Sequence, residues 1–285
     1  MRARGAEVLA PTHAELDLTD AFATRSAVEA ARPDAIVHAA ILNDQRRMLA
    51  DRELAWQSYV GATRHVVEAA NAVGAHVVLI STDWVFDGTQ GGADEKTRPN
   101  PVNLYGFLKA AAEVVVAERA QRGAVARLAG VQGVHWARPR TPRAQDAGFG
   151  YLVASLVDTL SAGLPFTVWE DPAINMIATP TLATDAGEML ARIVERGSCG
   201  IFHCTGGEAI DRRGLAAVAC EVFELDPSLL RFGPPPPGAL PGWSVPCDTS
   251  LDARVTAAAL GVELAGCGSI AERLRGQLET RELAA

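Results

Sequence analysis

Three side chains that together could reduce a carbonyl group lie within one stretch of the sequence, between Val77 and Lys109. Thr82 follows an apolar run, and Tyr105 and Lys109 stand four residues apart in a segment with a helical pattern. Residues four apart share one face of a helix, so the phenol and the ammonium should lie side by side. A nearby cation stabilises a phenolate, and we therefore expect the pKa of Tyr105 to be lowered. A hydroxyl to hold the carbonyl oxygen, a phenol to exchange its proton and a lysine to tune the phenol suit carbonyl reduction.

The same Tyr-Lys spacing occurs by accident in many helices, where an exposed pair is simply solvated. This chain has three tyrosines, and among its 26 lysines and arginines only Lys96 and Lys109 are lysines. A lysine four residues after a tyrosine is improbable in such a composition. The composition therefore favours the functional interpretation of the pair.

Two predicted elements must position these side chains. Residues 77–80 form an apolar, largely β-branched run of the length expected for a strand buried on both faces. This strand would deliver Ser81, Thr82 and Asp83 to its carboxyl end, where ligands bind in open parallel sheets. A helix is predicted over Leu104–Arg119, and it carries Tyr105 and Lys109. The strand end and the start of this helix should together form a site.

The remaining pattern alternates between strands and helices. Further strands are predicted at 6–10, 35–40, 124–130, 165–170 and 200–203, and further helices at Ala21–Ala31, 46–73 and 151–162 and from 270 onward. Residues 135–150, rich in arginine and proline, show no periodicity and are predicted to form a mobile loop on the substrate side.

Composition excludes several classes of protein. A chain of 285 residues should form one to two domains, and 48% hydrophobic with 21% charged residues is typical of a soluble globular protein. The net charge of −8 argues against nucleic acid or an anionic membrane as partner. Five cysteines without C-x-x-C spacing suggest neither a disulfide framework nor a metal site. Without a long apolar run or a signal segment, we expect a cytoplasmic protein.

The segment STDWVFDG, followed by DEKTRPNPVNLYGFLKAAAE, resembles the extended short-chain dehydrogenase/reductase family, most closely its dTDP-4-dehydrorhamnose reductase branch. Members of that branch read S-T-D-Y-V-F-D-G and then Y-G-x-x-K, with a glutamate four residues later, here Glu113. The resemblance implies an α/β fold: a Rossmann-type doubly wound parallel sheet in 1–130 and a smaller, mainly substrate-binding region in 131–285, some of which returns to the sheet. It also implies NADP or NAD as cofactor and a nucleotide-linked 4-keto-6-deoxysugar as substrate. A homodimer is one oligomeric state compatible with the resemblance.

The resemblance assigns roles to residues. It implies that Thr82, Tyr105 and Lys109 are the catalytic triad, with Tyr105 as proton donor and Lys109 also binding the nicotinamide ribose. Related dehydratases have Asp-Glu after the threonine, whereas this chain has Asp83-Trp84 and so lacks the extra acid. The residues expected to bind substrate are Thr82, Asp83 and Trp84, and those expected to bind cofactor are Asp17, Leu18, His38, Ala39, Ala40, Ser81, Tyr105 and Lys109.

The chain also departs from the family pattern. It has no Gly-x-x-Gly-x-x-Gly loop to cradle a pyrophosphate, so we expect that about 20–30 residues of a first strand-and-helix unit are missing before Met1. We also expect the sheet to show a gap or a re-paired strand there. Ser58 stands where the family has an asparagine, and Gly130 where it has a tryptophan. Two alternatives therefore stay open. One is a sugar-nucleotide epimerase, and the other is a non-catalytic subunit such as the regulatory subunit of methionine adenosyltransferase, which resembles this family.

Overall fold

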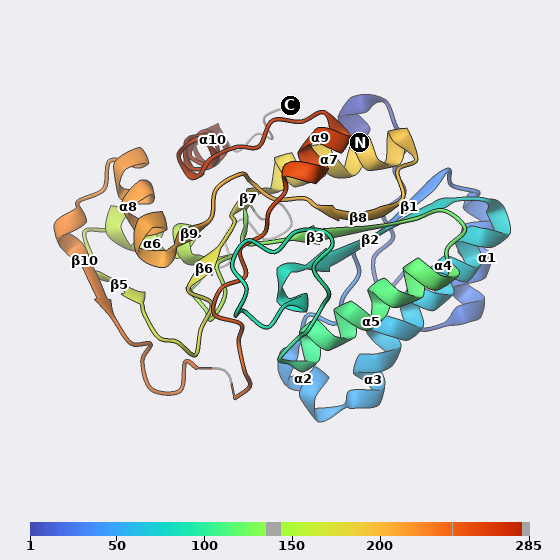
Figure 1. The fold of residues 1–285 in the computed structure, drawn as a ribbon, viewed down its shortest axis with the longest axis horizontal. Helices are drawn as coiled ribbons and strands as arrows, with labels where there is room; N and C mark the ends of the chain where they lie inside the picture. The colour runs from blue at the N-terminus through green and yellow to red at the C-terminus, as the bar shows by residue number, and fades with distance from the viewer. Residues whose placement is uncertain (135–143, 241, 281–285) are drawn as a thin grey trace. The chain divides into compact units, whose positions relative to one another are not determined.

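The computed structural model describes residues 1–134, 144–240 and 242–280 and divides into two compact units (Figure 1). Unit 1 comprises Met1–Val85, Pro99–Arg127 and Glu188–Phe202, and unit 2 comprises Phe86–Arg98, Leu128–Gly187 and His203–Ala285. The helices are α1 (Ala21–Ala31), α2 (Gln45–Ala50), α3 (Arg52–Trp56), α4 (Ala62–Val73), α5 (Leu104–Arg119), α6 (Leu152–Ser161), α7 (Ala183–Arg196), α8 (Arg212–Val222), α9 (Arg254–Leu260) and α10 (Cys267–Thr280). The strands are β1 (Ala35–His38), β2 (His76–Thr82), β3 (Gly123–Leu128), β4 (Val131–Gln132), β5 (Phe166–Trp169), β6 (Ile177–Ala178), β7 (Thr181–Leu182), β8 (Gly200–His203), β9 (Ile210–Asp211) and β10 (Leu230–Gly233).

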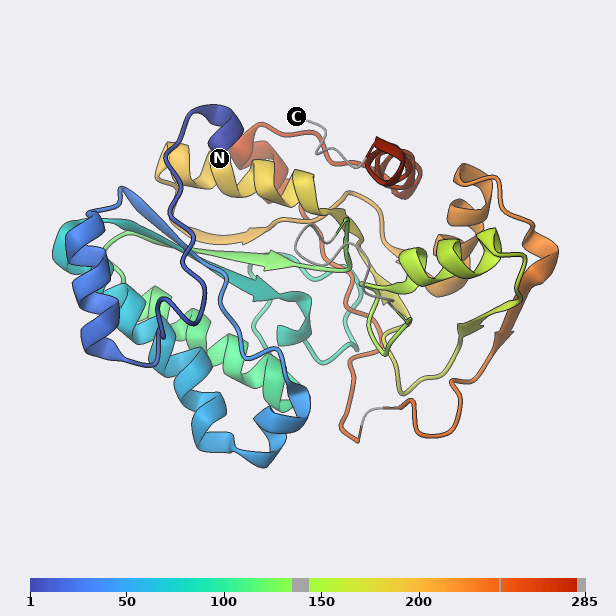
Figure 2. The same ribbon diagram turned by 180° about the vertical axis from the view of Figure 1, so that it is seen from behind.

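Unit 1 is built on a four-stranded sheet with the order β1-β2-β3-β8. β1 and β2 run parallel, with Ala35 opposite His76 and His38 opposite Leu79. α4 and α5 lie on one face of this sheet, and residues 188–196 of α7 lie on the other (Figures 1 and 2). This is the Rossmann-like arrangement of a parallel sheet between helices, which confirms the predicted fold class.

The core of unit 1 fixes α5 against β2. Val66 and Val67 of α4, Val77 and Leu79 of β2, and Val116 of α5 are all buried in one apolar cluster. Full burial of each such side chain stabilises the fold by about 1.5–3 kcal/mol. Because the cluster joins the two elements along their length, it also sets how the amino end of α5 lies against the carboxyl end of β2.

α5 begins and ends where the sequence predicts. Asn103 caps the helix, since its side chain accepts a 2.8 Å hydrogen bond from the backbone N–H of Gly106. Gly106 has a second role, because a Cβ atom there would lie only 2.1 Å from the carbonyl oxygen of Trp84. The turn after β2 can therefore pass directly against the first turn of α5.

Two predictions about the secondary structure of unit 1 were wrong. Residues 6–10 form no strand; a strand needs a neighbour for its backbone groups, and β1 stands at the edge of the described sheet. The helix predicted over 46–73 is interrupted at Asp51, whose side chain caps α3 by accepting a 2.9 Å hydrogen bond from Leu54 N. It then widens into a π-helical turn over Gln57–Gly61 before continuing as α4.

Unit 2 contains short strand pairs and a helical core. β5 pairs with β10 and β4 with β7 in parallel, while β6 and β9 are antiparallel. Its apolar cluster joins residues of α6, α8 and α10. The fully buried Arg212 donates hydrogen bonds to three backbone carbonyls, those of Asn175, Asp146 and Gly148, at 2.7, 2.9 and 2.6 Å. Of the predicted loop over 135–150, residues 135–143 lie outside the described residues. In the part of the chain that the structure describes, no helix is long and apolar enough to cross a membrane.

Candidate active site

The carboxyl end of β2 presents a hydroxyl group that is held by its own neighbours. Thr82 Oγ1 donates a 2.9 Å hydrogen bond to Asp83 Oδ1 and accepts one of 3.3 Å from Trp84 N. Thr82 and Asp83 are both buried. The Thr82 hydroxyl therefore has a defined direction at the end of the strand.

Tyr105 and Lys109 meet this strand end from the first turns of α5. The Tyr105 hydroxyl lies close enough to that of Thr82 for an interaction that lowers the pKa of the phenol. Lys109 Nζ donates a 2.8 Å hydrogen bond to the carbonyl oxygen of Ile80, two residues before Thr82. The structure thus brings together the three side chains that the sequence singles out as catalytic.

The pKa values of this cluster follow from burial. Burial is the main cause that raises the pKa of Tyr105 to about 12; the interaction with Thr82 lowers it, and the Asp83 carboxylate raises it further. The lowering that we expected from a neighbouring cation is therefore wrong for this structure, since desolvation outweighs the favourable contacts. Burial also lowers the pKa of Lys109 to about 8, and the charge of Glu113 acts against that shift. The phenol accordingly keeps its proton at neutral pH.

A buried ion pair lies beside the site. Arg127 donates two hydrogen bonds to the carboxylate of Glu113, from Nε to Oε1 at 3.0 Å and from Nη2 to Oε2 at 2.7 Å. Ser81 Oγ donates to the same Oε1 at 2.5 Å. The Ser81 hydroxyl, predicted to contact cofactor, is therefore engaged with Glu113. This network ties β2, β3 and α5 together.

The predicted cofactor residues after β1 differ in their surroundings. His38 is buried, and burial lowers its pKa to about 4, with a further lowering by the charge of Lys109. His38 is therefore a neutral imidazole close to the lysine. Ala39 and Ala40 follow the end of β1 and are exposed.

The other predicted cofactor residues, Asp17 and Leu18, lie in the turn before α1. Asp17 Oδ1 accepts hydrogen bonds from the backbone N–H and the hydroxyl of Thr19, at 2.9 and 2.8 Å, and these bonds lower its pKa. The carbonyl oxygen of Leu18 is hydrogen-bonded to His65 Nδ1 at 2.9 Å. Asp17 is thus bonded within its own turn, and Leu18 is bonded to α4.

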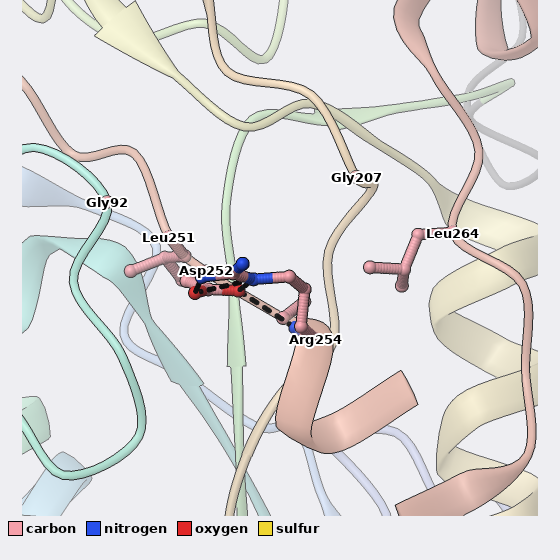
Figure 3. Close-up of a pocket in the computed structure, with 7 residues that line it drawn as sticks. Gly92, Gly207, Leu251, Asp252, Arg254 and Leu264 are labelled. Atoms are coloured by element: carbon pink, nitrogen blue, oxygen red, sulfur yellow. Dashed lines mark hydrogen bonds and ion pairs between the residues drawn. The ribbon is translucent and has the colours of Figure 1, made fainter. Parts of the chain in front are cut away.

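A surface pocket in unit 2 is built from different residues (Figure 3). It has a volume of about 300 Å³, and Asp252 and Arg254 within it form an ion pair of 2.6 Å, so their charges neutralise each other. None of the residues predicted from the sequence lines this pocket. Among residues 1–134, 144–240 and 242–280, no group of three or more His, Cys, Asp or Glu side chains is placed to hold a metal ion.

Sequence reasoning missed Tyr59 and Gly106 at this site. Tyr59 packs edge-on against Tyr105, and this contact between distant segments leaves no local signal in the sequence. Trp84, which the sequence analysis expected to bind substrate, lies against Tyr105 in a similar way, with the ring centroids 6.0 Å apart. Gly106 could have been noticed, because a glycine near the start of a helix costs stability unless a close approach requires it.

Comparison with known proteins identifies one family and two kinds of relatives. The model of the family described as RmlD substrate binding domain matches residues 1–236. The β subunit of methionine adenosyltransferase 2 from Xenopus tropicalis is 28% identical over 251 residues, which are 84% of this chain and 70% of that protein. The chain covers 64% of the length of the rat counterpart. A dTDP-4-dehydrorhamnose reductase from Streptomyces griseus is 28% identical over 80% of this chain and 72% of its own length.

Solved structures show the same fold. A dTDP-4-dehydrorhamnose reductase from Bacillus anthracis, crystallised in complex with NADP, superimposes with a TM-score of 0.80 over 97% of this chain and 92% of its own, at 21% identity. A hypothetical dTDP-4-dehydrorhamnose reductase from Sulfolobus tokodaii has a TM-score of 0.74 and 26% identity, over 93% of this chain and 87% of its own.

Proposed function

The chain belongs to the RmlD substrate binding domain family, and we propose that it is an NAD(P)H-dependent reductase of a nucleotide-linked 4-keto-6-deoxysugar. One arrangement carries this proposal: the hydroxyl groups of Thr82 and Tyr105 lie close together at the end of β2, and the buried Lys109 stands one helical turn further along α5. The reductases among its relatives support the choice of substrate class.

The residues at this site fit the nicotinamide end of such a cofactor. An ammonium group has three donors, and among the described residues the carbonyl oxygen of Ile80 is the hydrogen-bond acceptor found for Lys109. A buried donor without a partner is costly, so ribose hydroxyl groups would suit the remaining donors. The neutral His38 and the small Ala39 and Ala40 would border the same end. The sequence contains no Gly-x-x-Gly-x-x-Gly loop for the pyrophosphate, so the fit concerns the nicotinamide end.

The side chains would divide the reaction between them. Tyr105 would donate a hydrogen bond to the carbonyl oxygen, and so would Thr82 once its hydroxyl turns from Asp83 to the substrate. Both bonds would stabilise the negative charge that develops on that oxygen. When bound, the cofactor would supply the hydride that adds to the carbonyl carbon. Tyr105, which is protonated at neutral pH because its pKa is about 12, would give its proton to the oxygen and complete the alcohol. Lys109 would stabilise the phenolate until that phenolate takes a proton from solvent.

A direct assay tests this proposal. Purified protein is mixed with NADPH or NADH and dTDP-4-keto-6-deoxyglucose, and the loss of nicotinamide absorbance is followed. Tyr105→Phe removes the acid and keeps the ring, so kcat should fall by about 10²–10⁴-fold. Val114→Ala is the control on the same helix, because Val114 of α5 is 60% exposed and its substitution should leave turnover unchanged. Equal turnover in wild type and Tyr105→Phe would refute the proposal.

A second function has support of its own. Relatives named as the β subunit of methionine adenosyltransferase 2 match this chain at 26–28% identity, as high as the reductases do. We therefore propose a non-catalytic binding subunit as the rival. It predicts no turnover with either nicotinamide cofactor, together with co-elution with a methionine adenosyltransferase catalytic subunit in gel filtration. Turnover that Tyr105→Phe abolishes would exclude this rival.

A further inference from the structure

A π-helical turn brings a second tyrosine to the candidate active site. The turn spans Gln57–Gly61, between α3 and α4, and Tyr59 stands at its centre. A π-turn adds one residue to a helical turn and is frequently found at functional sites. Here it aims a large aromatic side chain at α5, in a cluster with Met48 and Leu108. Tyr59 is only 4% exposed.

Tyr59 touches two of the three candidate catalytic side chains. Its ring meets the ring of Tyr105 edge to face, with the centroids 6.0 Å apart and the planes at 79°. Lys109 Nζ lies over the face of the same ring, 5.5 Å from its centroid. The Tyr59 hydroxyl donates a 3.2 Å hydrogen bond to the carbonyl oxygen of Leu42 and so has a partner of its own. The contacts of Tyr59 with Tyr105 and Lys109 described here are made by its ring.

We propose that Tyr59 is a positioning residue: the face of its ring holds the ammonium group of Lys109, and its edge contact holds the ring of Tyr105. An aromatic face attracts a cation within about 6 Å of its centroid, and the attraction is larger where water is excluded. Edge-to-face aromatic pairs also favour one relative orientation. This inference deepens the proposed reductase and rests on it for the catalytic part. The contact with Lys109 can be tested on its own.

Other groups face the Lys109 ammonium and must be held constant in any test. The carbonyl oxygen of Ile80 accepts its hydrogen bond, and the Glu113 carboxylate favours the charged form. The neutral His38, the last residue of β1, feels the charge of Lys109. Tyr105 precedes Lys109 by one turn of α5. A substitution at Tyr59 leaves all four of these groups in the chain. A change in the titration of Lys109 would therefore report on the ring.

The composition of the chain makes the measurement direct. Lys96 and Lys109 are its only lysines, and Lys96 is exposed. Protein carrying ¹³C-labelled lysine therefore shows two Cε signals, and Lys96→Arg assigns them. The pH titration of each signal by NMR gives the pKa of each lysine in the absence of cofactor and substrate. Lys96 serves as the internal reference, since Tyr59 should not affect it.

Two substitutions separate the ring from the hydroxyl. Tyr59→Phe keeps the ring face and should leave the pKa of Lys109 near its wild-type value of about 8. Tyr59→Leu removes the ring face, and the loss of about 0.5–2 kcal/mol of cation–π attraction should lower that pKa by about 0.4–1.5 pH units. Tyr59→Met is a second variant of the same kind, because its flexible side chain fills irregular space if the leucine variant does not fold.

The outcomes decide the proposal. A Lys109 pKa that is the same in wild type, Tyr59→Leu and Tyr59→Met would show that Tyr59 only fills the core, even if the melting temperature falls. An equal drop in Tyr59→Phe would assign the effect to the hydroxyl and overturn the role of the ring. In the reductase assay, Tyr59→Leu should lower kcat by about tenfold or more with little change in KM, and Tyr59→Phe should restore kcat. If wild type shows no turnover, the proposed reductase fails while the titration still decides the contact between Tyr59 and Lys109.

Discussion

Replacing Arg127 by methionine should strongly destabilise unit 1, because the change leaves the carboxylate of Glu113 buried without its cation. The Arg127 side chain is fully buried, and that of Glu113 is 6% exposed. Their two hydrogen bonds, at 3.0 and 2.7 Å, form a bidentate pair that joins β3 to α5. After the substitution, Glu113 would keep the hydrogen bond from Ser81.

The size of the effect follows from the burial of the pair. Breaking a buried ion pair by removing one partner costs about 3–5 kcal/mol, whereas the net stability of a protein is about 5–15 kcal/mol. With an unfolding entropy of about 2.1 cal/mol/K per residue, a loss of this size in a chain of this length lowers the melting temperature by about 5–8 °C. The double variant Glu113→Gln, Arg127→Met carries no unpaired charge. It should therefore be more stable than Arg127→Met alone.

Urea unfolding, followed by the fluorescence of the five tryptophans, measures these differences. Arg213→Met is the matched control: Arg213 pairs with Glu170, but the two side chains are 57% and 31% exposed. Breaking that surface pair should cost less than about 1 kcal/mol. A loss for Arg127→Met no larger than that of the control would refute the reasoning, and so would a double variant as unstable as the sum of the two single changes.

Two further predictions concern other residues of unit 1. Burial lowers the pKa of His38 to about 4, from an ordinary value of about 6.5. As the pH drops, the unfolded chain therefore binds the proton before the folded protein does. The stability of the fold should fall by about 3 kcal/mol in total between about pH 6.5 and pH 4. Urea unfolding at several pH values should show a flatter dependence in His38→Gln, and equal slopes would contradict this. Gly106→Ala should lower the melting temperature, with a cost of about 1–3 kcal/mol, because its Cβ would lie 2.1 Å from the carbonyl oxygen of Trp84. Gly187→Ala in α7, with open space around the new methyl group, should be neutral or stabilising, and an equal loss in both variants would remove the steric explanation.

Local patterns predicted the elements whose signals lie within a few residues. The bounds of α5 and of α1 are those expected, because Asn103 and Asp20 provide clear caps and the apolar spacing continues to the end of each helix. The strand predicted at 6–10 was wrong because a strand depends on a neighbour that its own residues cannot specify. The interruption at Asp51 was missed, although an aspartate followed by good helix formers is a capping signal.

Some features of the candidate site could likewise be predicted from the sequence, and others could not. Thr82, Tyr105 and Lys109 could be chosen from residue type and spacing, and the structure brings them together. The pKa of Tyr105 could not be predicted, because it depends on how much water the fold removes from the phenol. Tyr59 could not be found either, since its ring reaches Lys109 from a segment fifty residues earlier in the chain.

The sequence by itself determined which chemical groups stand at the end of β2 and along α5, since side-chain type and helical spacing are local properties. Only the tertiary structure decided the charge on each group and its neighbours, namely a protonated phenol, a lysine over the ring of Tyr59 and a glutamate paired with Arg127. The physical reason is that desolvation and contacts between distant segments arise when α4 and α5 pack on the sheet, and no short window of sequence contains both partners.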